Sequence, residues 1–366
     1  MDWNYKNFRE MAAAYFTDRG WTFLTGEKDS LVKGYQQEFC VRQKMENLVN
    51  DNCFFKKIVP LFQELQIEDR TVSRMKNENH DTDLVIAGFQ TASFLLGKEE
   101  LKKESWYSFQ PVVRQKHLKE CGKQEGCISS FVNICLIDVD TSVEEYLVHT
   151  DWWITVLSRL SLHVSGLCLI LKKHTTAFGG FGIEFQYKGI EIGQANIYRA
   201  GNGQPAKYIS DFGFGYERLL WVVNGGRNFY YPFFNKYDIE EGSLEACDKM
   251  RTAVLLIMGG ILPSSAGAGK HVRRLIRLSK ECQDRFYEAR ILRYYQYYSK
   301  FICPLLNYEQ TVKVYIREAD GQQMKELCHK NMIRPPQNIK KDFLTEYEKL
   351  FFQKRQFMNN LGREKL

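Results

Sequence analysis

The 366-residue sequence has no long apolar run, no regular cysteine framework and no low-complexity tract. A membrane-spanning helix needs roughly 18 or more consecutive apolar residues, so the sequence predicts no membrane partner. The first residues, MDWNYKNFREM, are polar and lack the apolar segment of a signal peptide. The ten scattered cysteines are most simply reduced thiols, since disulfides are rare in a reducing cytosol. We therefore expect a cytoplasmic protein.

Two familiar ligand motifs are also missing. The segment CGKQEGC, residues 121–127, offers two cysteines and no nearby histidine at zinc-finger spacing, which argues against a zinc site. The segment GAGK, residues 267–270, is followed by His271, whereas a P-loop has Ser or Thr there and a different spacing before it.

What is present fits a protein with a large core. Apolar residues make up 44% of the chain and charged residues 26%, with 25 Phe and 20 Tyr. The length allows two domains of ordinary size. The net charge is +7, and residues 270–280 and the C-terminal tail carry much of the excess. That distribution favours a polyanionic partner.

The patterning predicts a sheet region followed by a helical region. Apolar spacing indicates helices over residues 5–19 and near 142–160, and residues 33–80 read as a partly helical insertion. Short strand-like runs separated by turns lie at 84–89, 111–115, 129–139, 163–171 and 182–200. Consecutive strands with few crossover helices favour an antiparallel sheet. We predict an α+β fold, with a sheet domain over 1–240 and an all-α domain over 241–366.

The segment ISDFGFGYERLLWVV, residues 209–223, predicts a strand-to-helix junction. The pattern is helical from Tyr216 and ends at the glycine pair 225–226. Gly213 and Gly215 allow a close approach of the backbone or a positive φ. Asp211 and Arg218 therefore flank the junction with opposite charges available to one ligand. The alternative is an ordinary helix start with a surface arginine.

Further charged residues fit a ligand that carries phosphate. Arg114 lies among apolar neighbours in a strand-like run and needs an anion, unless it is a surface arginine. Glu184 and Glu191 would approach one site if a turn at Lys188–Gly189 folds their segment into a hairpin. Paired carboxylates suggest Mg²⁺, which takes oxygen ligands and bridges substrate phosphates. With Arg218 on phosphate and Asp211 on an ammonium group, the set suits ATP plus an amino acid.

A basic stripe is predicted on the helix after the glycine-rich turn. Lys270, Arg273, Arg274 and Arg277 share one helical face, which suits nucleic-acid phosphates. A merely solvated helix face is the alternative.

Several segments together resemble class II aminoacyl-tRNA synthetases, and within them the alanyl-tRNA synthetases. Residues 81–101 are similar to the first signature-motif region, 108–118 with 129–137 to the second, and DFGFGYERL to the third. Residues 248–279 closely resemble the segment entering the tRNA-recognition domain, and 178–199 loosely resemble the strands that bind ATP, metal and amino acid. The resemblance spans about two thirds of the chain.

This resemblance implies a role for individual positions. The ATP-binding residues would be Arg114 on the α-phosphate and amino-acid carboxylate, Phe131 against adenine, Glu184 on Mg²⁺ and Arg218 on the terminal phosphates. Asp211 would bind the amino-acid ammonium group, with Gln194, Gly213 and Gly215 lining the amino-acid site.

The sequence also departs from that family. Residues 171–178 lack the tryptophan that closes the alanine pocket, and Ser265 and Ala266 replace an Asn–Glu pair whose Asn helps read the G·U pair of the tRNA. Thr82 stands where the first motif has proline, and the chain stops before an editing domain could begin. The amino acid and the tRNA identity element are therefore open, although Ser265 would still face the acceptor stem.

The resemblance implies an ATP-dependent ligase that forms an aminoacyl adenylate and transfers it to an acceptor. The 3′ end of a tRNA is the favoured acceptor, because of the basic stripe. The alternative is a paralogue that uses the adenylate to form an amide or ester with a small molecule or carrier protein. A catalytically inactive regulatory or RNA-binding paralogue is a third reading, against which the retained Arg114, Glu184, Asp211 and Arg218 argue.

Overall fold

One antiparallel sheet organises the molecule. The computed structural model describes residues 4–34, 49–77, 82–98, 100–114, 118–174, 179–200, 207–226, 229–230, 233–234, 238–239, 243–282 and 287–330. Within them the strand order is β1-β2-β6-β7-β8-β9-β5-β4-β3, and every pairing is antiparallel except β3 with β4. The strands are β1 (Thr22–Leu24), β2 (Ser30–Val32), β3 (Glu68–Asp69), β4 (Glu104–Val113), β5 (Ser130–Thr141), β6 (Leu167–His174), β7 (Gly180–Tyr187), β8 (Ile190–Ala200) and β9 (Lys207–Gly215).

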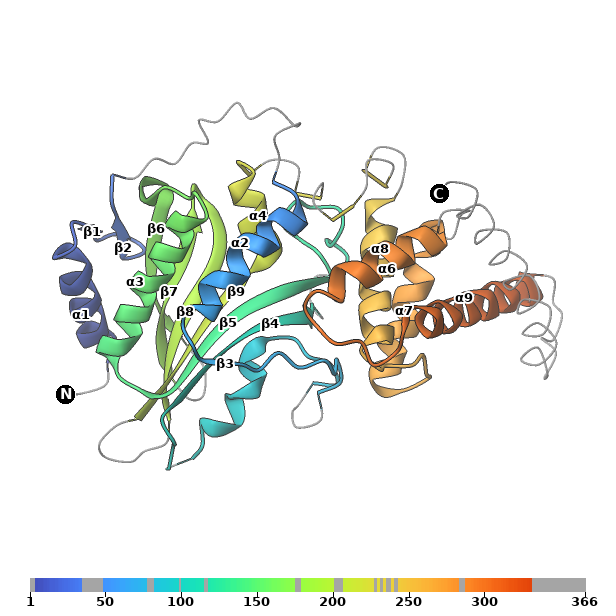
Figure 1. The fold of residues 1–366 in the computed structure, drawn as a ribbon, viewed down its shortest axis with the longest axis horizontal. Coiled ribbons are helices and arrows are strands. Elements are labelled where there is room, and N and C mark those ends of the chain that lie inside the picture. Colours follow the sequence, from blue (N-terminus) through green and yellow to red (C-terminus); the bar gives the residue numbers. More distant parts are fainter. Residues whose placement is uncertain are drawn as a thin grey trace.

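Three helices near the N-terminal half cover one face of this sheet (Figure 1). They are α1 (Tyr5–Thr17), α2 (Asp51–Gln63) and α3 (Val143–Arg159). The helices expected at 5–19 and 142–160 are thus confirmed, and α3 begins at Ser142 with a capping box that includes Glu145. Aromatic stacking fixes the layer: Phe214 of β9 stacks on Trp153 of α3, with ring centroids 3.8 Å apart.

One expectation within the sheet region is wrong. Residues 84–89 form no strand: Leu84 makes an isolated bridge and η2 (Gly88–Thr91) is a 3₁₀ helix. The Gln90 side chain causes this, because it accepts hydrogen bonds from the Ile86 and Ala87 amides and donates to Thr82. The segment 33–80 is partly helical over its described residues, as expected: α2 buries apolar side chains in the core, and β3 pairs with β4.

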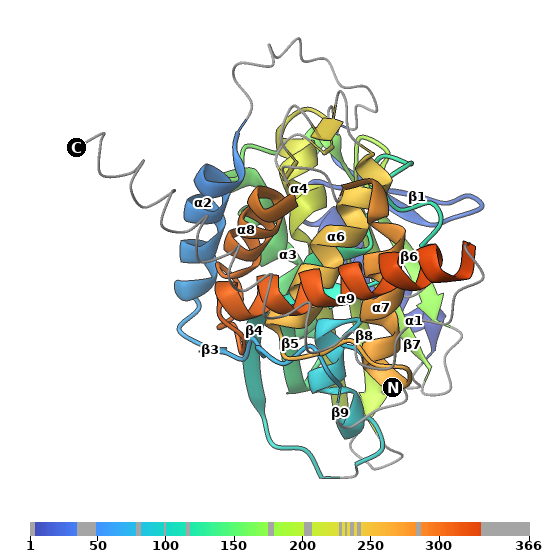
Figure 2. The same cartoon turned by 90° about the vertical axis from the view of Figure 1, so that its right-hand side faces the viewer.

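The helical region packs against one end of the sheet, as Figure 2 shows from that side. It contains α6 (Leu244–Met258), α7 (Gly267–Leu278), α8 (Tyr287–Tyr298) and α9 (Tyr308–Lys330). Residues 246–258 of α6 are all buried, and one continuous hydrophobic cluster joins them to the sheet. The predicted α+β architecture, with a helical region after the sheet, is confirmed, and the two regions share a core.

Candidate active site

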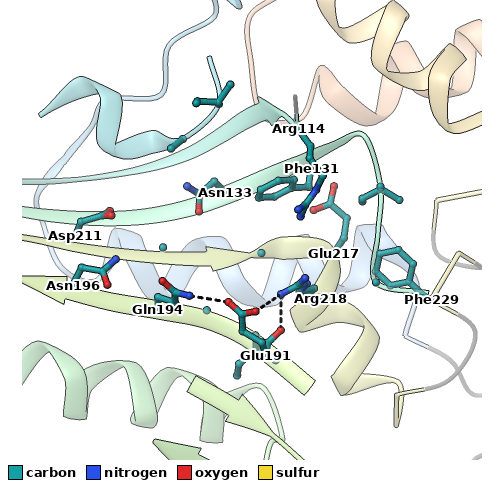
Figure 3. A pocket seen from close by; sticks show the side chains of 18 residues that line it. Arg114, Phe131, Asn133, Glu191, Gln194, Asn196, Asp211, Glu217, Arg218 and Phe229 are labelled. Atoms are coloured by element: carbon teal, nitrogen blue, oxygen red, sulfur yellow. Dashed lines mark hydrogen bonds and ion pairs between the residues drawn. The ribbon is translucent and has the colours of Figure 1, made fainter. Parts of the chain in front are cut away.

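A pocket of about 330 Å³ lies on the sheet face opposite α3. Side chains alternate across a strand, so Phe212 and Phe214 of β9 face α3 while Asp211, Gly213 and Gly215 face the pocket. Eight of the residues predicted from the sequence line this cavity: Arg114, Phe131, Glu191, Gln194, Asp211, Gly213, Gly215 and Arg218. Residues from segments as far apart as 114 and 218 are thereby brought to one site (Figure 3).

The predicted junction at the mouth of the pocket is present. β9 ends at Gly215 and α4 (Tyr216–Val223) begins at the next residue. Gly213 and Gly215 do not have a positive φ, so backbone conformation does not require glycine there. The absence of a side chain matters instead because it leaves space in the pocket. A Cβ on Gly213 would lie 3.3 Å from Asn133 Oδ1, and one on Gly215 would lie 3.5 Å from Arg218 Cβ. Side chains there would occupy the pocket.

Asp211 provides an acidic group at one end of the pocket (Figure 3). It lies opposite Asn196 in the β8–β9 register, and the Asn196 amide hydrogen-bonds to it. Its Oδ1 is shielded from solvent and has no hydrogen-bond partner among the residues that the structure describes. Burial raises the pKa of Asp211 to about 7, although the Asn196 hydrogen bond lowers it. A ligand ammonium group would offset this burial by supplying both a donor and a positive charge.

Arg114 and Phe131 lie at the other end (Figure 3). Arg114 directly follows β4, and its backbone amide donates to Ser129 O at 2.8 Å. The Arg114 guanidinium carbon lies 5.6 Å from the centre of the Phe131 ring, and within the described part of the chain its shielded Nε has no hydrogen-bond partner. A guanidinium held over an aromatic ring with a free donor suits a planar or anionic ligand group.

Arg218 is the second cation at this end and comes from the first turn of α4. Its Nη1 donates to Glu191 O at 3.0 Å and lies 3.3 Å from Glu191 Oε2. These contacts tie the arginine to β8. Its side chain still retains 31% exposure toward the pocket, which leaves donors for a ligand.

The predicted hairpin carrying Glu184 and Glu191 is confirmed. β7 and β8 pair through a turn in which Lys188 and Gly189 have φ of 48° and 84°. An irregularity after Phe185 places Glu191 opposite Gln186, and Glu184 lies opposite Gln194. Both carboxylates therefore belong to the same face of the hairpin.

These two carboxylates do not fit a preformed Mg²⁺ site. Glu184 does not line the pocket; it is buried and bonded to Lys172 and Gln186. Glu191 is already paired with Arg218 and accepts from Gln194. Among the described residues, no cluster of three or more His, Cys, Asp or Glu could hold a metal.

Ten lining residues escaped the sequence reasoning, among them Asn133, Asn196, Glu217 and Phe229. Asn196 follows Gln194 by two positions on one strand, so strand alternation could have placed it on the same face. Asn133 could have been found from Phe131 in the same way. Phe229 comes from the loop after α4, for which no periodic pattern exists.

The residues expected to touch tRNA lie on and before α7. Ser265, Lys270, Arg274 and Arg277 are exposed, and Val272, Leu275 and Ile276 form the buried face. Arg273 differs, because its Nε donates to Glu318 of α9 at 2.9 Å. The exposed basic stripe therefore consists of Lys270, Arg274 and Arg277.

Comparisons with known proteins add little. No protein-family model and no curated protein sequence matches the chain. Two solved structures of pyrrolysyl-tRNA synthetase from Desulfitobacterium hafniense are similar to it, at 13% and 14% identity. They cover 51% and 62% of this chain, each with 71% of its own length, at TM-scores of 0.36 and 0.30. Sequence identities and TM-scores this low do not establish a common function. Within the described residues, no helix is long and apolar enough to cross a membrane.

Proposed function

We propose that the pocket binds an amino acid together with ATP and forms an aminoacyl adenylate. One observation carries this proposal: a half-buried acid and a half-buried arginine, each with a shielded polar atom that lacks a partner among the described residues, lie at opposite ends of one cavity. A ligand that complements both must carry an ammonium group at one end and an anion at the other. The cavity volume of about 330 Å³ is within the range of small-molecule sites.

The arrangement supports in-line transfer at phosphorus. Asp211 would hold the ammonium group, so that the amino-acid carboxylate points toward Arg114. One carboxylate oxygen attacks the α-phosphorus of ATP, the bond to the bridging oxygen of pyrophosphate breaks, and pyrophosphate leaves. Arg114 and Arg218 would stabilise the negative charge that accumulates on phosphate oxygens. Positioning and charge are sufficient for this step, so no covalent nucleophile is required.

The same proposal includes a family and an acceptor. The motif resemblance supports a class II aminoacyl-tRNA synthetase, related to the alanyl enzymes, with a catalytic domain over 1–240 and a tRNA-recognition domain over 241–366. The exposed cations Lys270, Arg274 and Arg277 support the 3′ end of a tRNA as acceptor. Ser265, exposed just before them, would lie near the acceptor stem.

A second candidate acceptor is a small amine or a carrier protein. Two observations favour it over tRNA. Arg273 of the predicted stripe is already engaged by Glu318, which leaves fewer cations for phosphates. The strand that should carry the pocket tryptophan instead ends with Lys172, Lys173 and His174.

The test is amino-acid-dependent ATP–pyrophosphate exchange across all the proteinogenic amino acids, with and without bulk tRNA. Exchange with one or a few amino acids supports activation, and labelled aminoacyl-tRNA then identifies the acceptor. Exchange without any tRNA product favours the amide- or ester-forming paralogue. No exchange with any amino acid contradicts the proposal and favours an inactive paralogue.

A further inference from the structure

The helix α6 contains charged residues that are fully buried although the pocket lies outside it. Asp248, Lys249 and Arg251 are at most 1% exposed, as is Glu217 at the start of α4. Arg251 lies 3.6 Å from a carboxylate oxygen of Glu217 and of Asp248, and Lys249 Nζ lies 3.1 Å from Asp248. Two acids and two bases thus neutralise one another. Replacing buried ion pairs with apolar residues of similar volume is often neutral or stabilising, so stability alone does not account for them.

These side chains hold the backbone at the start of β5. Asp248 accepts hydrogen bonds from the Ser129 amide at 3.0 and 3.1 Å, and Arg251 donates to Ser130 O. The Thr252 hydroxyl lies 2.6 Å from the hydroxyls of both Ser129 and Ser130. The residue that follows this fixed pair is Phe131, which lines the pocket.

The same contacts continue to both pocket arginines. The Arg114 amide donates to Ser129 O, so the backbone that α6 holds also holds Arg114. Glu217 accepts from the Val132 amide at 2.9 Å and precedes Arg218 in the chain. Its Oε1 also accepts from the hydroxyl of Tyr297 on α8. Few covalent bonds therefore separate the buried network from each phosphate-facing residue.

We propose that α6, with the end of α8, is a positioning element of the pocket: its buried polar residues fix the places of Arg114, Phe131 and Arg218. The catalytic consequence rests on the proposed function, whereas the structural coupling does not. A displacement of about 1 Å in a reacting group can cost on the order of a hundredfold in rate. A rigid hydrogen-bonded support sets such positions more narrowly than apolar packing does.

Tyr298 offers a mild way to disturb this network, and Tyr315 offers a matched control. The Tyr298 hydroxyl lies 2.7 Å from Ser130 Oγ, and the Tyr315 hydroxyl lies 2.6 Å from Ser279 Oγ. Both rings are 0% exposed and both partners are buried serine hydroxyls. Tyr298→Phe and Tyr315→Phe therefore delete the same kind of bond, but only the first touches the support of β5.

The experiment compares the two variants in the full chain by hydrogen exchange and by pyrophosphate exchange. Both should show a similar, small decrease in melting temperature. Tyr298→Phe should speed amide exchange in peptides containing Arg114 and Ser129–Val132, and should lower kcat on the order of tenfold with little change in the KM for ATP. Tyr315→Phe should leave both readouts as in the wild type.

A double variant separates positioning from general damage. If the Tyr298 hydroxyl acts through Ser130, then adding Tyr298→Phe to Ser130→Ala should cause little further change in either readout. Equal behaviour of Tyr298→Phe and Tyr315→Phe in both readouts would overturn the inference. If the wild type exchanges no pyrophosphate with any amino acid, the proposed function fails. Hydrogen exchange alone then decides whether α6 positions the pocket.

Discussion

The charged side chains of α6 and those of the pocket differ in whether they have ion-pair partners within the protein. In α6, Asp248, Arg251 and their neighbours have ion-pair partners within the protein. In the pocket, Asp211 and Arg114 make no ion pair with any residue that the structure describes, and each retains a shielded atom without a hydrogen bond. Burying a charge is costly unless it is paired. The charges of α6 are paired within the protein, whereas under the proposed function a ligand would pair Asp211 and Arg114.

The comparison separates structural charges from functional ones. The signature in α6 is full burial with ion-pair partners, and the signature at Asp211 and Arg114 is partial burial without an ion pair among the described residues. A shielded atom without a hydrogen bond does not separate the two, because Arg251 Nε and Nη1 also lack a partner among the described residues. Arg218 is intermediate, because it is tied to Glu191 and still faces the cavity. Removing a charge should therefore reduce stability in α6 and reduce ligand binding or catalysis in the pocket.

The largest effect is expected at Arg251. Arg251→Met leaves Glu217 buried without its cation and Asp248 with Lys249 alone, which should lower the free energy of unfolding by about 3–5 kcal/mol. Urea unfolding followed by circular dichroism measures this loss. Arg114→Met is the matched variant in the pocket and should leave the free energy of unfolding unchanged or raise it. Equal losses in the two variants would remove the distinction between the regions.

Arg218 should follow as the next largest effect, now on catalysis. Arg218→Ala removes a cation that lines the pocket and that the proposed function assigns to the substrate phosphates, so pyrophosphate exchange should fall by about 10²–10³-fold. The melting temperature should change little, because Glu191 is 40% exposed and can be solvated after the loss. Initial-rate exchange assays and a thermal melt check the two expectations. A variant that melts early and retains activity would instead show that Arg218 is structural.

Asp211 should show both a ligand effect and a pH effect. Asp211→Asn removes the charge for an ammonium group, so amino-acid affinity should fall about 10–100-fold while ATP affinity stays near that of the wild type. Titration calorimetry with each ligand measures this. Equal losses for both ligands would indicate a structural role at the junction.

The pH effect has a defined sign. The pKa of Asp211 is raised to about 7 by burial, against about 3.9 in an unfolded chain. Between about pH 4 and pH 7 the folded state binds more protons, so this group lowers the free energy of unfolding as the pH rises. Asp211→Asn should therefore gain stability relative to the wild type between pH 5 and pH 8. Urea unfolding at the two pH values tests this, and an unchanged difference would contradict the burial of the carboxylate.

The smallest effects are expected on α7. Replacing Lys270, Arg274 and Arg277 by Gln should leave pyrophosphate exchange intact and reduce the salt dependence of tRNA binding by about 0.9 per lost phosphate contact. Arg273→Gln should change tRNA binding less, because Arg273 is paired with Glu318. Filter binding at several salt concentrations measures both. An equal loss from Arg273→Gln alone would show that the ion pair opens for RNA.

Much of the fold could be predicted because its signals are local. The junction at Gly215–Tyr216 and the turn at Lys188–Gly189 follow from glycine placement and apolar periodicity. The strand predicted for residues 84–89 is wrong because an apolar run is typical of a strand, whereas here the side chain of Gln90 bonds to the backbone and closes a 3₁₀ turn. Periodicity contains no information about such a contact.

The sequence predicted which residues line the site better than it predicted the contacts that those residues make. Residues on neighbouring strands, such as Gln194 and Asp211, gather because the register brings them together. Glu184 was wrongly predicted to lie in the site. Its carboxylate is bonded to Lys172 of β6, and the sequence pattern did not indicate that β6 pairs with the strand of Glu184. The buried network around Arg251 was also missed, since a charged residue in an apolar helix does not reveal its partner in the sequence.

The central claim is that Arg114 faces the phosphates of an amino-acid-activating site. Pyrophosphate exchange with the best amino acid should be measured on the wild type, on Arg114→Ala and on Arg70→Ala. Arg70 is the control, because it lies over the Trp106 ring and pairs with Glu68 and Glu104 outside the pocket. We predict robust exchange in the wild type and in Arg70→Ala, and a loss of about two orders of magnitude or more in Arg114→Ala. Equal exchange in all three proteins would contradict the account.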